Sequence, residues 1–336
     1  MKMLTVAILG ATGAVGQEFL SILEERNFPI GELRLLASSR STGKKVTFKG
    51  RTYTLEAARP DSFAGVDLVL SSAGGSVSRE LAPHAVKAGA LVVDNTSAFR
   101  MDPGVPLVVP EINPQDIAQN KGIIANPNCS TIIMVVPLFP LHKISSIRRV
   151  VAATYQAASG AGALAMKELE EQSREVLAGA KASPKIFPHQ IAFNLFSHNS
   201  AIKENGYCEE EIKMMQETKK IFHDEKIQVV ATTVRVPVFR AHSEALFVEF
   251  EKPFELEAVY EALRAAPGVR LVDDRAKNYF PMPVEASGGD DVLVGRIRKD
   301  PSHPNGLALF VSGDQIRKGA ALNAVQIAEI WARGRA

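Results

Sequence analysis

Cys129 is the residue whose surroundings in the sequence most suggest chemistry, because it stands where a strand-like run gives way to a helix-like run. Residues 121–126 read as a short buried strand, and residues 130–136 as the first turns of an apolar helix. The sulfur would then face the unpaired N–H groups of the helix start, which lower the pKa of a thiol. The alternative is an ordinary buried cysteine, and two further features favour a nucleophile.

The first feature is an amino-terminal strand, glycine loop and helix. Apolar residues 4–9 lead into a loop with glycines at three-residue spacing, and an amphipathic run over residues 17–23 follows. Such glycines let the backbone turn tightly and approach a pyrophosphate at the helix N-terminus. The residues expected to contact a dinucleotide here are Gly10, Thr12, Gly13, Ala14, Val15 and Gly16.

The next predicted strand, residues 33–37, ends in hydroxyl and basic residues rather than in an acidic one. An Asp or Glu at this point would bind a ribose 2′-hydroxyl and repel a 2′-phosphate. Ser38, Arg40 and Ser41 can instead bind that phosphate through charge-assisted hydrogen bonds. We therefore expect NADP as the cofactor; a solvated basic loop is the alternative, and some use of NAD stays open.

The second feature is His242, the best candidate for a general acid and base. It lies in a predicted break between β-prone runs at residues 227–234 and 245–250. Beside a thiolate and a hydride-carrying cofactor, an imidazole with an ordinary pKa suits proton transfer in both directions near pH 7. The other histidines lack a comparable setting, and no pair has metal-ligand spacing with a cysteine, so we expect no catalytic metal.

Composition agrees with an enzyme of two domains. The chain has 336 residues, 46% of them hydrophobic, which exceeds one ordinary core. The formal net charge is only +2 and the basic residues are scattered, so we expect no nucleic acid and no membrane as partner. The sequence has no signal-peptide pattern and only 2 cysteines, too few for a disulfide framework, which favours a cytoplasmic location.

Element patterns predict the fold class α/β. Strands at residues 66–72 and 90–95 around a helix at 76–88 indicate a Rossmann-type doubly wound parallel sheet. Later β-prone runs indicate a mixed, largely antiparallel sheet in an α+β domain. We expect a NADP-binding domain over residues 1–128, completed by a C-terminal helix over 317–336, and a catalytic and dimerisation domain over 129–316.

Six motifs together resemble the aspartate-semialdehyde dehydrogenase family, over residues 4 to about 330. They lie at residues 10–16, 38–41, 95–100, 127–131, 159–162 and 235–244. The resemblance implies NADPH-dependent reduction of L-aspartyl 4-phosphate to L-aspartate 4-semialdehyde and inorganic phosphate. That step leads to lysine, threonine and methionine, and in bacteria to diaminopimelate. The resemblance also implies a homodimer, sometimes paired into tetramers.

The resemblance further implies a role for each matching residue. Cys129 would attack the acyl phosphate and form a thioester, while His242 moves the protons. Arg235 would bind the substrate carboxylate and Glu210 its amine, although Glu209 and Glu211 leave a slip of one residue open. The remaining roles are substrate orientation for Gln156, phosphate binding for Arg100 and Lys213, and cofactor contact for Ser159, Gly160, Gln315 and Asn323.

One departure from the family pattern and three rival functions remain. Ala241 stands where the family more often has glycine. An N-acetylglutamyl-phosphate reductase shares the fold, but that family carries a glycine where this chain has Asn128, and its acetylated substrate has no free amine. A catalytically silent NADP-binding homologue would have lost the nucleophile or the histidine. A glyceraldehyde-phosphate type dehydrogenase places its thiolate in a different local sequence.

Overall fold

The computed structural model describes residues 3–334, which divide into two compact units. Within the described residues, the first unit comprises the chain up to Asn128 together with the chain from Ala320 onward. The second unit is Cys129–Gly319. No helix among residues 3–334 combines the length and the apolar character needed to cross a bilayer.

The first unit is built on a sheet of six parallel strands in the order β5-β2-β1-β6-β7-β8. The order runs outward in both directions from β1, so the edge beside the carboxyl end of β1 is a switch point, where such sheets bind ligands. The strands are β1 (Leu4–Leu9), β2 (Ile30–Ala37), β5 (Glu56–Ala57), β6 (Leu68–Ser71), β7 (Leu91–Asp94) and β8 (Ile123–Ala125).

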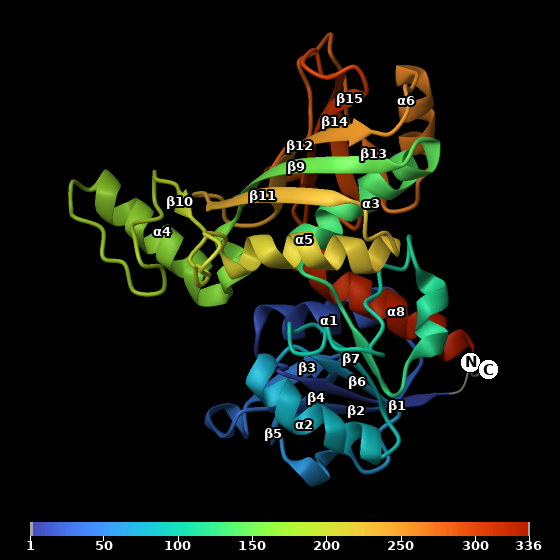
Figure 1. Ribbon diagram of the computed structural model, residues 1–336. Coiled ribbons are helices and arrows are strands. Elements are labelled where there is room, and N and C mark those ends of the chain that lie inside the picture. The colour runs from blue at the N-terminus through green and yellow to red at the C-terminus, as the bar shows by residue number, and fades with distance from the viewer. Residues whose placement is uncertain (1–2, 335–336) are drawn as a thin grey trace. The chain divides into compact units, whose positions relative to one another are not determined.

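Helices cover both faces of this sheet because its strands are apolar on both sides. Val6 and Ile8 belong to one apolar cluster, with α1 (Ala14–Glu25) and α8 (Leu322–Arg333). Ala7 and Leu9 belong to a second cluster, with α2 (Gly75–Lys87). Figure 1 shows α1 and α8 on one side of these strands and α2 on the other. The remaining elements of the unit are η1 (Ser39–Ser41), β3 (Lys45–Phe48), β4 (Arg51–Thr54), η2 (Pro60–Phe63) and η3 (Pro114–Gln119).

The second unit is built on a mixed sheet of seven strands in the order β10-β11-β9-β12-β15-β14-β13. Only the pairs β11/β9 and β13/β14 are parallel among those described. The strands are β9 (Ile147–Gln156), β10 (Phe196–Ser197), β11 (Gln228–Arg235), β12 (His242–Phe250), β13 (Val269–Leu271), β14 (Val292–Lys299) and β15 (Gly306–Gly313). The expected fold class is therefore confirmed.

Helices α3 (Cys129–Ile144) and α5 (Glu209–Phe222) pack on one face of the second sheet (Figure 1). Alternate residues of β12 are buried, beginning with His242 and continuing through Glu244 and Leu246. On the intervening positions Phe247 is 40% exposed, as is Tyr155 of β9. The other helical segments of the unit are η4 (Ala158–Ala161), α4 (Ala163–Leu177), α6 (Leu256–Ala265), α7 (Pro283–Ala286) and η5 (Arg317–Ala321).

Two local expectations need correction. His242 does not lie in a break between strands: it is the first residue of β12, because the ladder with β15 already begins at the pair His242 and Gly313. The C-terminal helix expected over residues 317–336 does not begin as an α-helix, because a π-helical turn over Arg317–Ala321 precedes α8.

Candidate active site

The switch point of the first sheet holds a cavity of about 640 Å³, lined entirely by residues of the first unit. Gly10, Thr12 and Gly13 line it from the loop after β1, and Ser38 and Arg40 from the end of β2. The other residues predicted for the cofactor in this segment, Ala14, Val15, Gly16 and Ser41, do not line the cavity. They belong instead to the first turn of α1 and to η1.

The glycine loop meets the physical requirements for binding a dinucleotide. Gly10 has φ +92°, and a Cβ there would lie 2.6 Å from the carbonyl oxygen of Ser72. A Cβ on Gly16 would lie 2.3 Å from the carbonyl oxygen of Gly10. Gly13 caps α1 without a side-chain hydrogen bond, and the first turn carries no acidic residue. The amides of that turn therefore suit an anionic pyrophosphate, and the residues present fit the cofactor.

Arg100 and Asn323, the other predicted site residues of the first unit, are buried and hydrogen-bonded to the chain around Asn126. Arg100 donates from Nε to the carbonyl of Asn126 and from Nη2 to the carbonyl of Asn95, each at 2.9 Å. Asn323 donates from Nδ2 to Asn126 Oδ1 at 2.7 Å and to the carbonyl of Val108 at 2.9 Å. Both residues therefore brace the segment that precedes Cys129 in sequence.

Cys129 is the first residue of α3 and is partly exposed. The rest of α3 is almost wholly apolar, which explains why the residues directly after Cys129 are buried. Within the first turn of the helix, Cys129 is the accessible residue. A Cβ on Gly319 would lie 2.9 Å from the Cβ of Cys129. The chain therefore packs against Cys129 at a position that has no room for a side chain.

His242 is fully buried and is held through one ring nitrogen only. Its Nδ1 accepts the backbone N–H of Ala157 at 3.0 Å, which places the proton of the neutral ring on Nε2. Nε2 has no hydrogen-bond partner among the residues that the structure describes. Burial, followed by the charge of Arg235, holds the pKa of His242 well below its ordinary value. The ring is thus a weaker base than the sequence led us to expect, because an imidazolium would lose its hydration there.

Arg235, the last residue of β11, is fixed by neighbours that the sequence did not reveal. Its Nη1 donates to the carbonyl of Ala157 at 3.2 Å, and its Nη2 lies 2.8 Å from His198 Nε2. Burial, followed by the charge of Arg235, lowers the pKa of His198 to about 4. On the other side of the ring, His198 Nδ1 accepts the backbone N–H of Ser200 at 3.1 Å and lies 3.0 Å from Ser200 Oγ.

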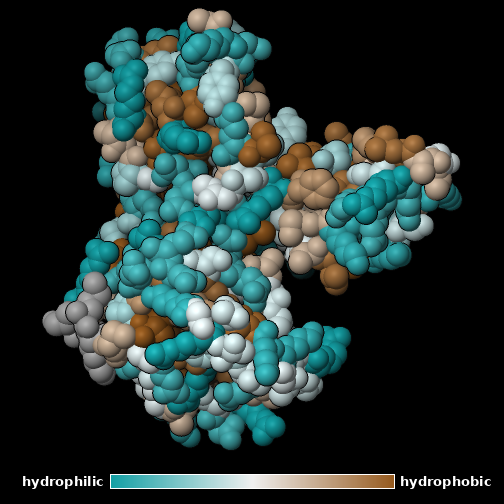
Figure 2. Space-filling view, turned by 180° about the vertical axis from the view of Figure 1, so that it is seen from behind, coloured by the Kyte–Doolittle hydropathy of each residue, from teal (hydrophilic) through white to brown (hydrophobic). Residues whose placement is uncertain are grey.

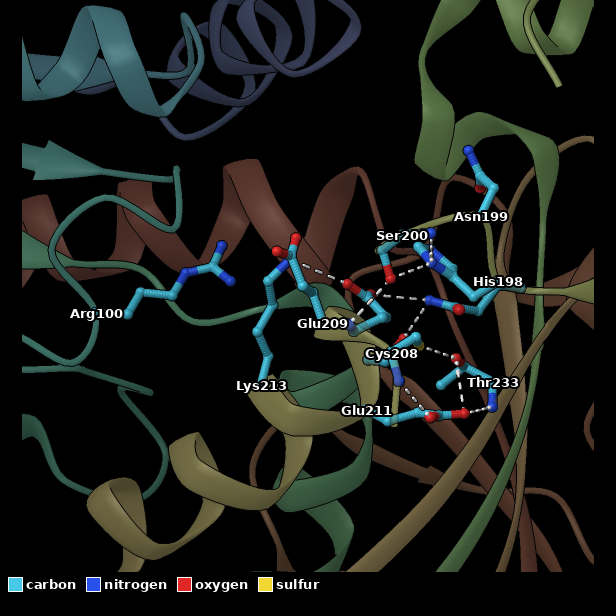
Figure 3. Close-up of polar contacts among 12 residues, drawn as sticks. Arg100, His198, Asn199, Ser200, Cys208, Glu209, Glu211, Lys213 and Thr233 are labelled. Atoms are coloured by element: carbon cyan, nitrogen blue, oxygen red, sulfur yellow. Dashed lines mark hydrogen bonds and ion pairs between the residues drawn. The ribbon is translucent and has the colours of Figure 1, made fainter. Parts of the chain in front are cut away.

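The three consecutive glutamates at the start of α5 have three different environments. Glu209 is partly exposed and pairs with Lys203 at 2.6 Å. Glu211 accepts the N–H of Cys208 at 2.9 Å and that of Thr233 at 3.0 Å, as Figure 3 shows. Glu210 is 5% exposed and, unlike the other two, accepts a hydrogen bond from the side chain of Gln156. Helical geometry therefore separates residues that the sequence could not distinguish.

Gln156, at the end of β9, joins Glu210 to the start of α3. Its Nε2 donates to Ser130 Oγ at 2.8 Å and to Glu210 Oε1 at 3.1 Å, which fixes the orientation of the amide. Lys213 Nζ lies 3.3 Å from Glu210 Oε2. The structure thus brings Gln156, Glu210 and Lys213 together in the second unit, as one network that ends beside Cys129.

Three residues predicted to contact the cofactor, Ser159, Gly160 and Gln315, lie around His242 and its neighbour Ala241. Gln315 donates from Nε2 to Ser159 Oγ and accepts the N–H of Ala241 at Oε1, 2.9 Å away. A Cβ on Gly160 would lie 2.7 Å from Arg235 Nη1 and 3.0 Å from His242 Cε1. These residues therefore set the position of the imidazole, in addition to any cofactor contact.

Sequence reasoning missed several members of this network. Ala157 acts through its backbone alone and gives no sequence signal. His198 stands in a polar run, Ser197 to Ser200, that could have been noticed as a cluster of hydrogen-bonding side chains. Ser130 was read only as part of a helix start. Across residues 3–334, no group of three or more His, Cys, Asp or Glu is placed to hold a metal ion.

Comparison with known proteins identifies the family. Residues 5–120 match the sequence model of the semialdehyde dehydrogenase NAD-binding domain, and residues 138–318 that of the semialdehyde dehydrogenase dimerisation domain. An aspartate-semialdehyde dehydrogenase of Synechocystis is 61% identical over 325 residues, covering 97% of this chain and 96% of the relative. The chain belongs to the aspartate-semialdehyde dehydrogenase family.

Solved structures of aspartate-semialdehyde dehydrogenases have the same fold. Aspartate semialdehyde dehydrogenase II of Vibrio cholerae, complexed with ASA, is 47% identical and covers 99% of both chains with a TM-score of 0.96. The enzyme of Candida albicans, with NADP, is 27% identical and covers 98% of both chains with a TM-score of 0.75. This chain is accordingly an oxidoreductase with a nicotinamide-dinucleotide domain.

Proposed function

We propose that the chain reduces L-aspartyl 4-phosphate with NADPH to L-aspartate 4-semialdehyde and inorganic phosphate through a thioester on Cys129. The observation that carries the proposal is one network in the second unit. The network combines buried Arg235 and Glu210 with the buried imidazole of His242, whose Nε2 has no partner among the described residues. The same unit holds Cys129, which is partly exposed at the start of α3. Membership of the aspartate-semialdehyde dehydrogenase family supports the choice of substrate.

The charges of the second unit match those of the substrate. Arg235 offers a planar two-pronged donor for the α-carboxylate, and Glu210 a buried carboxylate for the ammonium group. Lys213 supplies a cation for the phosphate, and Arg100 of the first unit is proposed as the second phosphate ligand. Because Glu210 is already hydrogen-bonded to Gln156, substrate binding would fix the amide that orients the reacting carbonyl.

The proposed chemistry uses the neutral state of His242. Its imidazole takes the proton of the Cys129 thiol, and the sulfur attacks the acyl carbon, so that phosphate leaves and a thioester forms. NADPH, when bound, supplies the hydride that reduces the thioester. The imidazolium returns its proton as the hemithioacetal collapses and the sulfur leaves. A lowered pKa makes that imidazolium a strong acid for the second step.

The cofactor would be held by the first unit. The amides at the start of α1 are proposed to bind the pyrophosphate, and Ser38 and Arg40 the 2′-phosphate of NADP. Ser159, Gly160, Gln315 and Asn323 remain proposed cofactor contacts. The reaction would supply lysine, threonine, methionine and diaminopimelate synthesis in the cytoplasm.

We further propose that two copies of the chain form a homodimer through the second unit, which matches a dimerisation domain. Hydrophobic side chains gather on the surface of this unit in Figure 2. Phe247 and Tyr155 are exposed on the same face of the neighbouring strands β12 and β9. The opposite face of both strands is buried. Sedimentation of Phe247→Glu against Glu249→Gln would test this; an unchanged dimer in the first variant would contradict it.

The reaction is best tested in reverse, because the semialdehyde is the more stable substrate. We expect phosphate-dependent reduction of NADP by L-aspartate 4-semialdehyde, slower turnover with NAD, and none with N-acetylglutamate semialdehyde or glyceraldehyde 3-phosphate. Cys129→Ser should lose at least about 10³-fold in kcat while still binding NADPH. NADPH binding without turnover of any aldehyde would instead favour a catalytically silent protein.

A further inference from the structure

Glu244 is a fully buried carboxyl that the proposed mechanism does not use. It lies on β12 two residues after His242, on the same buried face of the strand. Neither of its carboxyl oxygens has a hydrogen-bond partner, and Glu244 forms no ion pair with any described residue. An ionised carboxylate without a partner is very costly inside a protein, so a neutral acid, which carries an O–H donor, is the stable form at this position.

Two more polar atoms without partners lie on the same face of the adjacent strand. Thr154 of β9 stands directly opposite Glu244, and its Oγ1 has no hydrogen-bond partner within residues 3–334. Gln156 lies two residues further along β9, at the diagonal position from Glu244, and its Oε1 also lacks a partner in the described part of the chain. Long side chains at diagonal positions of an antiparallel pair approach closely enough for a water to bridge them.

The amide oxygen of Gln156 lacks a hydrogen-bond donor among the described residues. Both donors of its Nε2 are used, by Ser130 and by Glu210. What remains is an acceptor, Oε1, and the cluster therefore needs a donor rather than a second carboxylate. An ionised Glu244 would also repel Glu210, and burial together with that charge raises the pKa of Glu244 well above its ordinary value.

We propose that Glu244 is a positioning residue that stays protonated in the working enzyme and donates, through a water shared with Thr154, to the carboxamide oxygen of Gln156. Glu244 does not touch the substrate. It acts on the reaction through Gln156, whose amide it keeps directed at Glu210 and at the start of α3. This inference rests on the proposed function, because it assigns Glu244 to the orientation of that substrate.

Four variants test the proposal in the phosphate-dependent assay. Glu244→Gln keeps a neutral donor and should retain kcat within about twofold, whereas Glu244→Met, of similar volume, should lower kcat about tenfold. Thr154→Val should lower kcat by a smaller factor. The double variant Glu244→Met with Thr154→Val should be no slower than Glu244→Met alone, because both changes remove the same water-mediated bridge. Leu246→Met, on the same face of β12, is the control and should leave kcat unchanged.

Two results would overturn the proposal. Equal kcat for Glu244→Met and wild type, with only the unfolding temperature lowered, would make Glu244 a structural residue. Equal losses in Glu244→Gln and Glu244→Met would mean that an ionised carboxylate is required. Infrared difference spectra at pH 7 add a readout independent of turnover: the carbonyl band of a protonated carboxylic acid should be present in wild type and absent from Glu244→Gln. If wild type binds NADPH but turns over no semialdehyde, the proposed function fails, while the infrared result still decides the state of Glu244.

Discussion

The two units present two kinds of candidate binding site. In the first unit the site consists mainly of backbone: the glycine loop and the amides of the α1 N-terminus, beside a cavity that Arg40 also lines. In the second unit it consists of buried polar side chains that hydrogen-bond to one another, among them His242, Arg235 and Glu210. A backbone site requires a local conformation, whereas a side-chain site requires an assembled sheet.

This difference determines how strongly each site should respond to the substitution of one residue. The backbone site should tolerate the loss of a side chain with a graded loss of affinity, because the amides remain. The side-chain site keeps charged groups away from water, so the loss of one member leaves another buried without its partner. The predictions below test that contrast, beginning with the largest effect.

Replacing His242 should cause the largest loss. His242→Asn should lower kcat by about 10² to 10⁴-fold, because no other described group offers a free imidazole nitrogen at this position. In wild type the acid limb of the pH profile of kcat/KM should lie well below pH 6.5, because burial keeps the ring neutral. His84→Asn on the surface of α2 is the control. A loss below tenfold, or an acid limb at an ordinary imidazole pKa, would contradict the assignment.

The second prediction concerns stability in acid. The folded pKa of His198 is about 4 and the unfolded value is about 6.5, so below pH 6.5 the unfolded chain takes up a proton first. Stability should therefore fall as the pH falls from 6.5 to 4, by roughly 3 kcal/mol from this residue when the loss is complete. His198→Gln cannot take up that proton.

Urea unfolding at pH 7, 5.5 and 4.5 would test this linkage. The stability of His198→Gln relative to wild type should improve steadily as the pH is lowered, even if the variant is less stable at pH 7 through its altered bond to Arg235. His84→Gln serves as the exposed comparison. Parallel pH profiles for His198→Gln and wild type would mean that the buried network does not resist protonation of His198.

The third prediction concerns the backbone site. Arg40→Ala should raise KM for NADP by about 10 to 100-fold, the effect of one charge-assisted bond, and leave KM for NAD nearly unchanged. The rest of the cofactor would still be held by the helix start. Lys44→Ala, nearby but outside the cavity, is the matched control. Equal losses with NADP and NAD would show that Arg40 does not read the 2′-phosphate.

The same contrast explains what could be predicted from the sequence. The glycine loop, the end of β2 and the start of α3 are contiguous stretches, so a local pattern was enough to predict the turn at Gly10 and the helix start at Cys129. His242, Arg235 and their partners Ala157 and His198 come from four separate segments, brought together by the register of β9, β11 and β12. No local pattern specifies Ala157 or His198 as neighbours of these side chains, nor does it give the depth of burial that lowers the pKa of His242.

Ala241 gives the smallest expected effect and the sharpest test of how the side-chain site is held. It has φ +72°, a left-handed conformation that costs a non-glycine residue about 1 kcal/mol, and its N–H donates to Gln315. Glycine relieves that strain, but it also loses more freedom on folding and removes a buried methyl group. We therefore expect Ala241→Gly to raise the unfolding temperature by only about 1 to 2 °C.

Ala245→Gly is the matched control, since it makes the same chemical change at a nearby residue of β12 with ordinary β geometry. It should lower the unfolding temperature, because only the cost of glycine remains. A loss of stability in Ala241→Gly as large as in Ala245→Gly would mean that the left-handed turn carries no strain. A gain in Ala241→Gly alone would mean that the chain just before β12 bends against the conformational preference of alanine in order to bring His242 beneath Gly160. The position of the imidazole would then be set by the tertiary network rather than by local conformation.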